Sequence, residues 1–214
     1  MKSKALLIAA AALAAGVMTS QAQVYSQNIV GYINVPLSVG YNLVANQLDL
    51  DGTGTNNSIY SVIGSTLPGN TKVLAWNGGG YSTAIYSSAS QKWIGNNQTV
   101  TNAMQPGSGF FVNVAVATNV TFVGNVITGT NNYPIVAGYQ IVAPSGPVAG
   151  TIDGTNGYHP SKNDKLLVWN GGGYATKIYN GTTWVGGNPQ LAVGQSVFLN
   201  ASSNNVWTEV LNVQ

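Results

Sequence analysis

The sequence predicts an all-β protein, because its composition, its short apolar runs and an internal repeat each favour strands joined by turns. Residues that prefer strands, such as Val, Ile, Tyr, Trp and Thr, are frequent, whereas charged residues make up only 6% of the chain. A chain so poor in Glu, Lys and Arg disfavours solvated surface helices. Clusters of Gly, Asn, Pro and Ser separate the apolar runs, with the spacing of a sandwich or barrel. The runs cover residues 29–35, 41–45, 72–76, 109–114 and 119–123.

The first 22 residues predict a secretory signal peptide. Lys2 and Lys4 precede an apolar run over residues 5–17, and Ser20 and Ala22 are small residues at the −3 and −1 positions of a cleavage site. The run is shorter than the roughly 20 residues of a spanning helix. We therefore expect cleavage near Ala22 and a protein secreted to the periplasm, the cell surface or the extracellular space, with no membrane span after cleavage.

One segment has the periodicity of a helix rather than a strand. Ile59, Val62 and Ile63 fall at i, i+3 and i+4, behind Asn residues that can cap a helix. We expect one or two helical turns within residues 57–64.

The two halves of the chain repeat each other in register. The hexapeptide Trp-Asn-Gly-Gly-Gly-Tyr occurs at 76–81 and again at 169–174. Further matched segments follow in the same order: 40–45 with 138–143, 70–76 with 163–169, 81–86 with 174–179, and 106–112 with 193–199. A tandem duplication is therefore predicted, with unit 1 over residues 23–123 and unit 2 over residues 124–214. We expect them to form a β-sandwich or a pair of sandwiches, with a barrel as the alternative.

The repeated hexapeptide is typical of a hairpin. Asn-Gly followed by two more glycines supplies the positive φ angles of a tight loop, between a strand that ends in Trp and a strand that opens with Tyr.

These motifs resemble a family of uncharacterised secreted bacterial β-proteins. The residues that carry the resemblance are 40–48, 76–81, 106–112 and 119–124. The resemblance implies export and a β fold, and it implies no activity.

Charge and composition exclude several functions. Residues 23–214 contain five lysines, no arginine and five acidic residues, so the mature chain has no net charge with which to bind nucleic acid. The positions matched between the units hold glycines, aromatics and aliphatics, and the only matched charges are Lys72 and Lys165. His159 is the sole histidine and cysteine is absent, so the usual zinc sites and Cys-His pairs are missing. We predict that the protein is not an enzyme.

One acidic segment resembles the start of a calcium loop. Asp49, Asp51 and Thr53 stand at alternate positions, with glycine at the sixth, but Tyr60 replaces the Glu expected at the twelfth. A weak Ca²⁺ site and a polar turn rich in Asx residues are the two interpretations. No other cofactor is predicted.

The repeated aromatic residues also have two interpretations. They can provide flat platforms on which sugar rings stack, or they can fill the core and pair across the hairpins. The candidate ligand-binding residues are Trp76, Tyr81, Trp93, Trp169, Tyr174 and Trp184.

Two main functions follow from these patterns. We expect a structural or adhesive protein of the cell surface or extracellular space, able to associate with itself through strand edges. A carbohydrate-binding module for surface glycans is the alternative, and a Ca²⁺-stabilised surface domain is the minor one.

Overall fold

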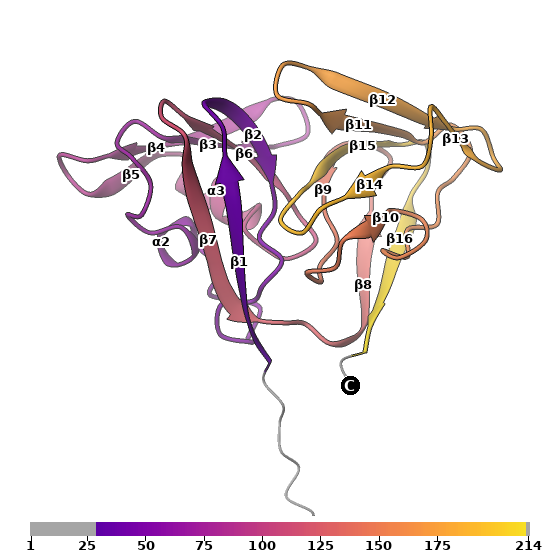
Figure 1. Cartoon of the computed structure of the whole chain (residues 1–214), viewed down its shortest axis with the longest axis horizontal. Coiled ribbons are helices and arrows are strands. Elements are labelled where there is room, and N and C mark those ends of the chain that lie inside the picture. The colour runs from indigo at the N-terminus through magenta and orange to yellow at the C-terminus, as the bar shows by residue number, and fades with distance from the viewer. Residues whose placement is uncertain (1–28, 213–214) are drawn as a thin grey trace, which may run out of the picture.

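The computed structural model describes residues 29–212, so the predicted signal peptide lies outside the described residues (Figure 1). Unit 1 contains β1 (Val30–Leu37), β2 (Gly40–Val44), α2 (Ile59–Val62), β3 (Lys72–Trp76), β4 (Tyr81–Ser87), β5 (Lys92–Gly95), α3 (Asn97–Asn102), β6 (Phe110–Val114) and β7 (Thr118–Asn125). Unit 2 contains β8 (Gly129–Ile135), β9 (Gly138–Val142), β10 (Gly150–Thr151), β11 (Lys165–Trp169), β12 (Tyr174–Tyr179), β13 (Trp184–Val185), β14 (Gln190–Leu191), β15 (Val197–Ala201) and β16 (Asn205–Leu211).

The two units have the same topology. Unit 1 has a five-stranded antiparallel sheet in the order β2-β6-β3-β4-β5, and unit 2 repeats it as β9-β15-β11-β12-β13. Each unit adds a two-stranded ribbon, β1 with β7 and β8 with β16. Since β7 ends at Asn125 and β8 begins at Gly129, the connection between the units is residues 126–128, and each unit keeps its own first strand.

The all-β prediction is confirmed, and none of the sheets in residues 29–212 closes into a barrel. The sheets are sandwich-like, because each unit buries one core between its five-stranded sheet and its ribbon. In unit 1, Ile33 and Phe122 of the ribbon pack with Val73 and Val112 of the sheet. In unit 2, Ile135 and Trp207 of the ribbon pack with Leu166 and Leu199. Both ribbons lie on the same side of the five-stranded sheets in Figure 1.

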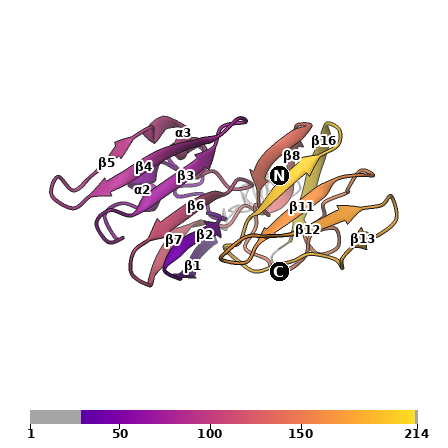
Figure 2. The same cartoon turned by 90° about the horizontal axis from the view of Figure 1, so that it is seen from above.

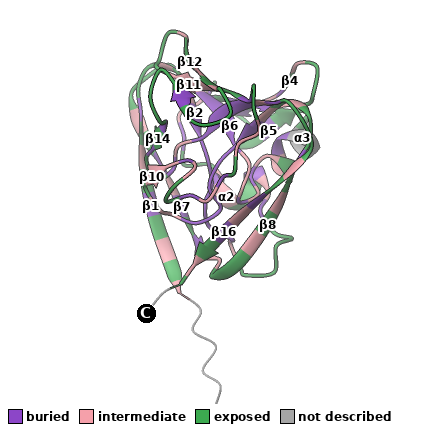
Figure 3. Ribbon diagram, turned by 90° about the vertical axis from the view of Figure 1, so that its right-hand side faces the viewer, coloured by how far each residue is buried: buried purple, intermediate pink, exposed green. Residues whose placement is uncertain are grey.

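Residues on the opposite sheet face meet between the units. Along β3, Val73 and Ala75 point into the core, so Leu74 and Trp76 point away from it. A third cluster of buried residues, drawn from both units, lies on this face. Figure 2 shows the units side by side, and in Figure 3 the buried residues run through the interior while the hairpin tips near β4 and β12 are exposed.

The predicted short helix is confirmed as α2, at residues 59–62. Its N-cap is Ser58, whose side chain accepts a hydrogen bond from the backbone N–H of Ser61, and not one of the Asn residues. Asn57 is instead buried, and its amide donates to Asp49 and Gln105. The sequence pattern did not predict α3, because its six residues are mostly polar.

Both hexapeptides form the same hairpin turn. The backbone N–H of Asn77 donates to the carbonyl oxygen of Gly80, and the Asn77 side-chain oxygen accepts from two glycine N–H groups. Asn170 makes the matching bonds in unit 2. The glycine after each Asn, Gly78 or Gly171, has a φ of 95°.

The helices of residues 29–212 are all too short to cross a membrane.

Candidate functional site

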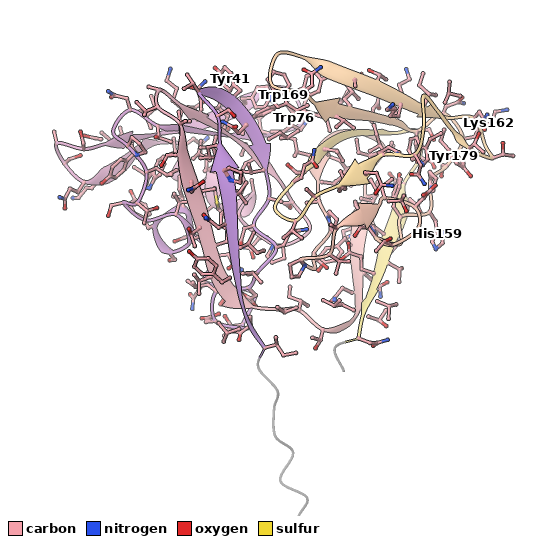
Figure 4. All side chains as sticks on the ribbon, viewed as in Figure 1. Tyr41, Trp76, His159, Lys162, Trp169 and Tyr179 are labelled. Atoms are coloured by element: carbon pink, nitrogen blue, oxygen red, sulfur yellow. The ribbon has the colours of Figure 1, made fainter. Side chains whose placement is uncertain are left out.

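The two units are joined by a reciprocal pair of tryptophan hydrogen bonds. The indole Nε1–H of Trp76, in β3, donates to the backbone carbonyl oxygen of Tyr139, in β9, at 2.8 Å. The indole of Trp169, in β11, donates to the carbonyl oxygen of Tyr41, in β2, also at 2.8 Å. Matched residues thus make matched contacts in opposite directions, which is the pattern of a two-fold relation. Figure 4 shows Tyr41, Trp76 and Trp169 gathered at the junction of the units.

An inter-unit cluster of apolar side chains surrounds these bonds. Phe111 packs edge-on against Trp169, with ring centroids 5.3 Å apart, and Phe198 packs in the same way against Trp76, at 5.1 Å. Such pairs add to the hydrophobic stabilisation of the junction. The buried centre of the cluster consists of Leu43, Phe111, Ile141 and Phe198.

The tyrosines of the two hexapeptides close the cluster. Tyr81 lies edge-on to Trp76 at 5.3 Å, and Tyr174 lies edge-on to Trp169 at 5.0 Å. Burial raises the pKa of the Tyr81 hydroxyl, and a hydrogen bond with Tyr174 raises it further, so the two side chains meet across the junction. Their exposed fractions are 42% and 37%, so the structure brings them together but leaves part of each ring in water.

Backbone bonds reinforce the junction with the same reciprocity. The N–H of Ala45 donates to the carbonyl oxygen of Gly194, and the N–H of Ala143, at the matched position, donates to that of Gly107. Gln47 is fully buried and bonds only to unit 2: its amide donates to the carbonyl oxygens of Pro144 and Gly146, and its side-chain oxygen accepts from the Gly194 N–H. The two units therefore form one body.

Trp93 and Trp184, the other predicted ligand-binding tryptophans, are placed elsewhere. Each is buried in the core of its own unit, with exposed fractions of 3% and 5%. Trp93 packs on Tyr86 and donates its indole N–H to the carbonyl oxygen of Gly64. Trp184 packs on Tyr179 and donates to the Asp153 carboxylate. Burial of both rings leaves no face on which a sugar could stack.

A groove lies on each side of the junction, beside a hexapeptide tryptophan. The Trp169 groove has a volume of about 380 Å³ and is walled by residues from both units, including Tyr41, Asn42, Asn170 and Gln195. The Trp76 groove has a volume of about 410 Å³, and its walls include Asn77, Ser108 and Gln140. The grooves are counterparts in the repeat, because Asn77 matches Asn170 and Gln140 matches Asn42. No charged side chain lines either groove among the described residues.

The outer face of each sheet also carries a matched row of exposed side chains. In unit 1, cross-strand pairing places Ile94, Ile85, Lys72, Asn113 and Tyr41 side by side across five strands. We call these residues outer row 1. In unit 2, the corresponding outer row 2 consists of Val185, Ile178, Lys165, Asn200 and Tyr139. Both lysines, the only matched charges of the sequence, therefore stand in the same place between an isoleucine and an asparagine.

The acidic segment forms a turn in which N–H donors surround the carboxylates. Asp49 is buried and accepts from the Gly54 N–H at 2.8 Å and from the Asn57 amide at 2.9 Å. Asp51 accepts from the N–H and hydroxyl of Thr53 and from the Asn56 amide. These bonds lower the pKa of the Asp51 carboxyl, the Thr53 hydroxyl having the largest effect. In residues 29–212 no three His, Cys, Asp or Glu side chains gather as a metal site would require.

Asp164 and Tyr158 belong to a structural hydrogen-bond network. Asp164 is buried and accepts from the Tyr158 hydroxyl at 2.7 Å and from the Ser202 N–H at 2.7 Å. Burial raises the pKa of Tyr158, as does its bond with Asp164. His159 is exposed at the outer side of unit 2, as Figure 4 shows, and hydrogen-bonds to neither Asp153 nor Asp164. A Ser-His-Asp triad that uses His159 with either carboxylate is therefore not assembled.

Among residues 29–212, Glu209 is the one buried carboxylate with an unpaired oxygen. Its Oε2 accepts from the backbone N–H of Ser145 at 2.8 Å, from the Ser145 hydroxyl and from the Gly146 N–H at 3.3 Å. Its Oε1 has no hydrogen-bond partner in the described part of the chain. Burial raises the pKa of Glu209 above the ordinary range of a glutamate, against the lowering effect of the Ser145 bonds.

Comparison with known proteins gives no match, either to a family model, to a curated protein or to a solved structure. The resemblance to secreted β-proteins therefore stays a prediction.

Several residues of the junction were missed as functional candidates in the sequence. Tyr41 matches Tyr139 in the repeat, and Phe111 matches Phe198. The recurrence of these aromatic residues in the matched segments could therefore have identified them as candidates. Gln47 gave no such signal, because its counterpart in unit 2 is Ser145.

Proposed function

We propose that this protein is an exported, non-catalytic adhesive protein that presents one surface twice on a single rigid body. The observation that carries the proposal is the pair of outer rows. Core packing and the inter-unit cluster explain why many residues recur, but they do not require the exposed members of the outer rows to recur. Ile94 and Val185, for example, occupy matched positions with exposed fractions of 59% and 57%. Ile85 and Ile94 are adjacent across the strands, as are Ile178 and Val185, so each unit exposes an apolar pair that a partner could cover.

The use of the ionisable residues supports a function without catalysis. A general acid or base needs a titratable group that reaches into a site. The buried carboxylates of Asp49 and Asp164 are held by neighbouring donors, and neither groove beside the junction has a charged lining residue. Glu209 has an unpaired oxygen, but it lines a cavity of only about 20 Å³, which is too small for a substrate.

The rigid junction supports binding through both rows at once. When two binding surfaces are held on one body, the second contact forms at a high effective concentration, so the pair binds far more tightly than one surface alone. The tryptophan bonds and Gln47 hold the rows in a fixed relation. An adhesive protein gains most from this arrangement on a surface that repeats its own binding sites.

The test is co-sedimentation of the mature chain, residues 23–214, with envelope fragments of the producing cells. Three variants are compared with the wild type: Ile85→Ser with Ile94→Ser, Ile178→Ser with Val185→Ser, and all four together. We expect each double variant to weaken retention about tenfold or more, since avidity is lost with either row. The fourfold variant should lose the most retention of the three.

Val123→Ser with Val210→Ser is the matched control. Both valines are exposed but lie on the ribbons, outside the outer rows. The control should be retained like the wild type. If the fourfold variant is retained as well as the wild type, or if the wild type is not retained at all, the outer rows are not an adhesive surface.

A further inference from the structure

We infer that the Trp169 groove is a binding site for a short segment of a neutral polysaccharide. It is a different surface from the aliphatic part of the outer rows. The inference goes beyond the proposed function, because it assigns a second binding surface with a ligand class of its own.

The position of the groove explains how it is kept in shape. Its walls come from the end of β1, the turn after it and β2 in unit 1, and from the hexapeptide hairpin and the segment before β15 in unit 2. The Trp169 hydrogen bond to Tyr41 joins the two walls directly. The site therefore exists only when the two units are docked, and it is formed before any ligand arrives, as in most ligand pockets.

The lining of the groove selects a neutral ligand with both apolar and polar surface. A charged ligand would lose water without gaining an opposite charge, because no Lys, Asp, Glu or His lines the groove. The half-buried ring of Trp169, with Val35, Pro36 and Val193, offers an apolar wall. Amide groups stand at its edge. A sugar ring matches this combination, since its C–H face packs on aromatic surface and its hydroxyl groups bond to amides.

Two amides of the groove have free donors. The side-chain oxygen of Asn170 accepts from Gly172 and Gly173, and that of Gln195 accepts from the Ala192 N–H at 3.0 Å. Neither amide nitrogen donates to a protein atom in the described part of the chain. Each side chain is thus fixed by its oxygen and presents its N–H groups outward, where hydroxyl oxygens of a sugar can accept.

The matched Trp76 groove lacks this feature. The amide nitrogen of Asn77, the counterpart of Asn170, already donates to the Ser82 hydroxyl at 3.2 Å, and Ser108 replaces Gln195. The Trp76 groove has the same tryptophan wall but fewer free donors. It therefore serves as an internal comparison within one molecule.

An open groove suits a polymer better than a small metabolite. Ser38, Val39, Asn170 and Val193 line it and are exposed, so a segment of a longer chain can lie in the groove while the rest of that chain stays in water. The volume of about 380 Å³ is near the lower end of the range of ligand pockets. Only a short segment of a longer glycan is therefore held.

The test is a calorimetric titration of the mature chain with soluble cello-, xylo-, manno- and chito-oligosaccharides, with tryptophan fluorescence recorded in parallel. The main variant is Asn170→Asp with Gln195→Glu. It keeps both turn-stabilising oxygens and replaces the free N–H donors with carboxylate oxygens. We expect at least one oligosaccharide to bind the wild type, and the variant to bind it at least tenfold more weakly.

Two controls separate the site from general effects of charge. Asn180→Asp makes the same change at a turn outside the groove, where the Asn180 oxygen accepts from Thr182 and Thr183. Asn77→Asp makes it in the Trp76 groove. Both should bind like the wild type. Val193→Trp, which fills the groove from an exposed position, should abolish binding even if the main variant folds poorly in a thermal melt.

Three results would overturn the inference: no oligosaccharide binds at millimolar concentration, the groove variants bind like the wild type, or Asn180→Asp weakens binding equally. These failures are distinguishable from failure of the proposed function. If the Trp169-groove variants lose no oligosaccharide binding while the outer-row variants lose retention on envelope fragments, the assignment of the groove as a glycan site is wrong and the adhesive function stands.

Discussion

Trp169 donates its indole N–H to the backbone carbonyl oxygen of Tyr41, a residue 128 positions away in the other unit. Trp76 returns the same bond to Tyr139 over 63 positions. The indole N–H of the repeated hexapeptide's tryptophan therefore bonds outside its own hairpin. It joins one unit to an edge strand of the other, whereas the glycines that follow the tryptophan form the turn.

Removing one of these N–H groups should destabilise the whole chain. We expect Trp169→Phe to lower the free energy of unfolding by about 0.5–1.5 kcal/mol, because a hydrogen bond between the units is lost while part of the ring packing is kept. Urea denaturation followed by circular dichroism measures this change. Trp76→Phe should cost a similar amount. Tyr32→Phe, at an exposed ribbon position, is the control and should cost nothing measurable. A wild-type midpoint for Trp169→Phe would contradict the prediction.

Gln47 should decide whether the two units unfold together. Gln47→Leu leaves the Pro144 carbonyl oxygen and the Gly194 N–H unpaired in a buried place, at a cost on the order of 2–4 kcal/mol. The Gly146 carbonyl oxygen also loses its bond to Gln47 but still accepts from the Val148 N–H. We expect a single calorimetric transition for the wild type and two separate transitions for the variant, because the lost bonds all cross the junction. Gln140→Leu, which removes an exposed local bond to Val136, is the comparison. One unchanged transition in the Gln47 variant would refute the assigned role.

Glu209 should make stability fall as the pH rises. Its pKa is raised in the folded state, so the folded chain holds the proton more tightly than the unfolded chain does. The stabilising contribution is complete below the unfolded pKa of about 4.3 and is lost as the pH rises through the folded value. Asp51, whose pKa is lowered, acts in the opposite direction, so the comparison must be made against a variant.

Glu209→Gln is that variant, because it cannot ionise and keeps a carbonyl oxygen for Ser145. We expect the stability of this variant, relative to that of the wild type, to increase as the pH rises from 4 to 7, because only the wild type loses the contribution of the protonated Glu209. Urea denaturation at both values provides the measurement. Parallel pH profiles for the two proteins would show that Glu209 does not titrate as proposed.

Calcium should leave the acidic turn unchanged. The carboxylates of Asp49 and Asp51 already accept from N–H and O–H donors, and a cation would have to displace these groups. We expect the same thermal midpoint with Ca²⁺ and with a chelator. A rise of several degrees in Ca²⁺, absent in Asp51→Asn, would instead establish the cation site.

The duplication, the strands and the hairpin turns could be predicted from the sequence, because each depends on local chemistry. Residues that recur in register reveal a repeat, and Asn-Gly pairs favour tight turns whatever surrounds them. The choice of sheet face was harder. Tyr81 and Tyr86 lie on the same strand, five residues apart, and an odd spacing puts them on opposite faces. Their partners Trp76 and Trp93 therefore have opposite surroundings, one at the junction and one in the core.

The contacts between the units could not be predicted, because they depend on how two finished sheets dock. From the sequence alone, Leu74 and Trp76 are expected to be partly exposed, because they lie on the outer face of the sheet. Their burial depends on the second sheet that packs against this face. The buried polar residues have the same difficulty. Gln47 and Glu209 belong to no recognisable motif. Their hydrogen-bond partners lie 97 and 64 residues away in the sequence, so local patterns do not indicate that these side chains are buried.

The reciprocal junction has a consequence for assembly. Each unit gives its tryptophan to the other and receives one in return, so the contact is isologous, and both halves of it are used within one chain. Such a contact closes on itself and offers no place for a third unit. The single chain therefore has the arrangement of a two-fold dimer. Any larger assembly must form through a different surface.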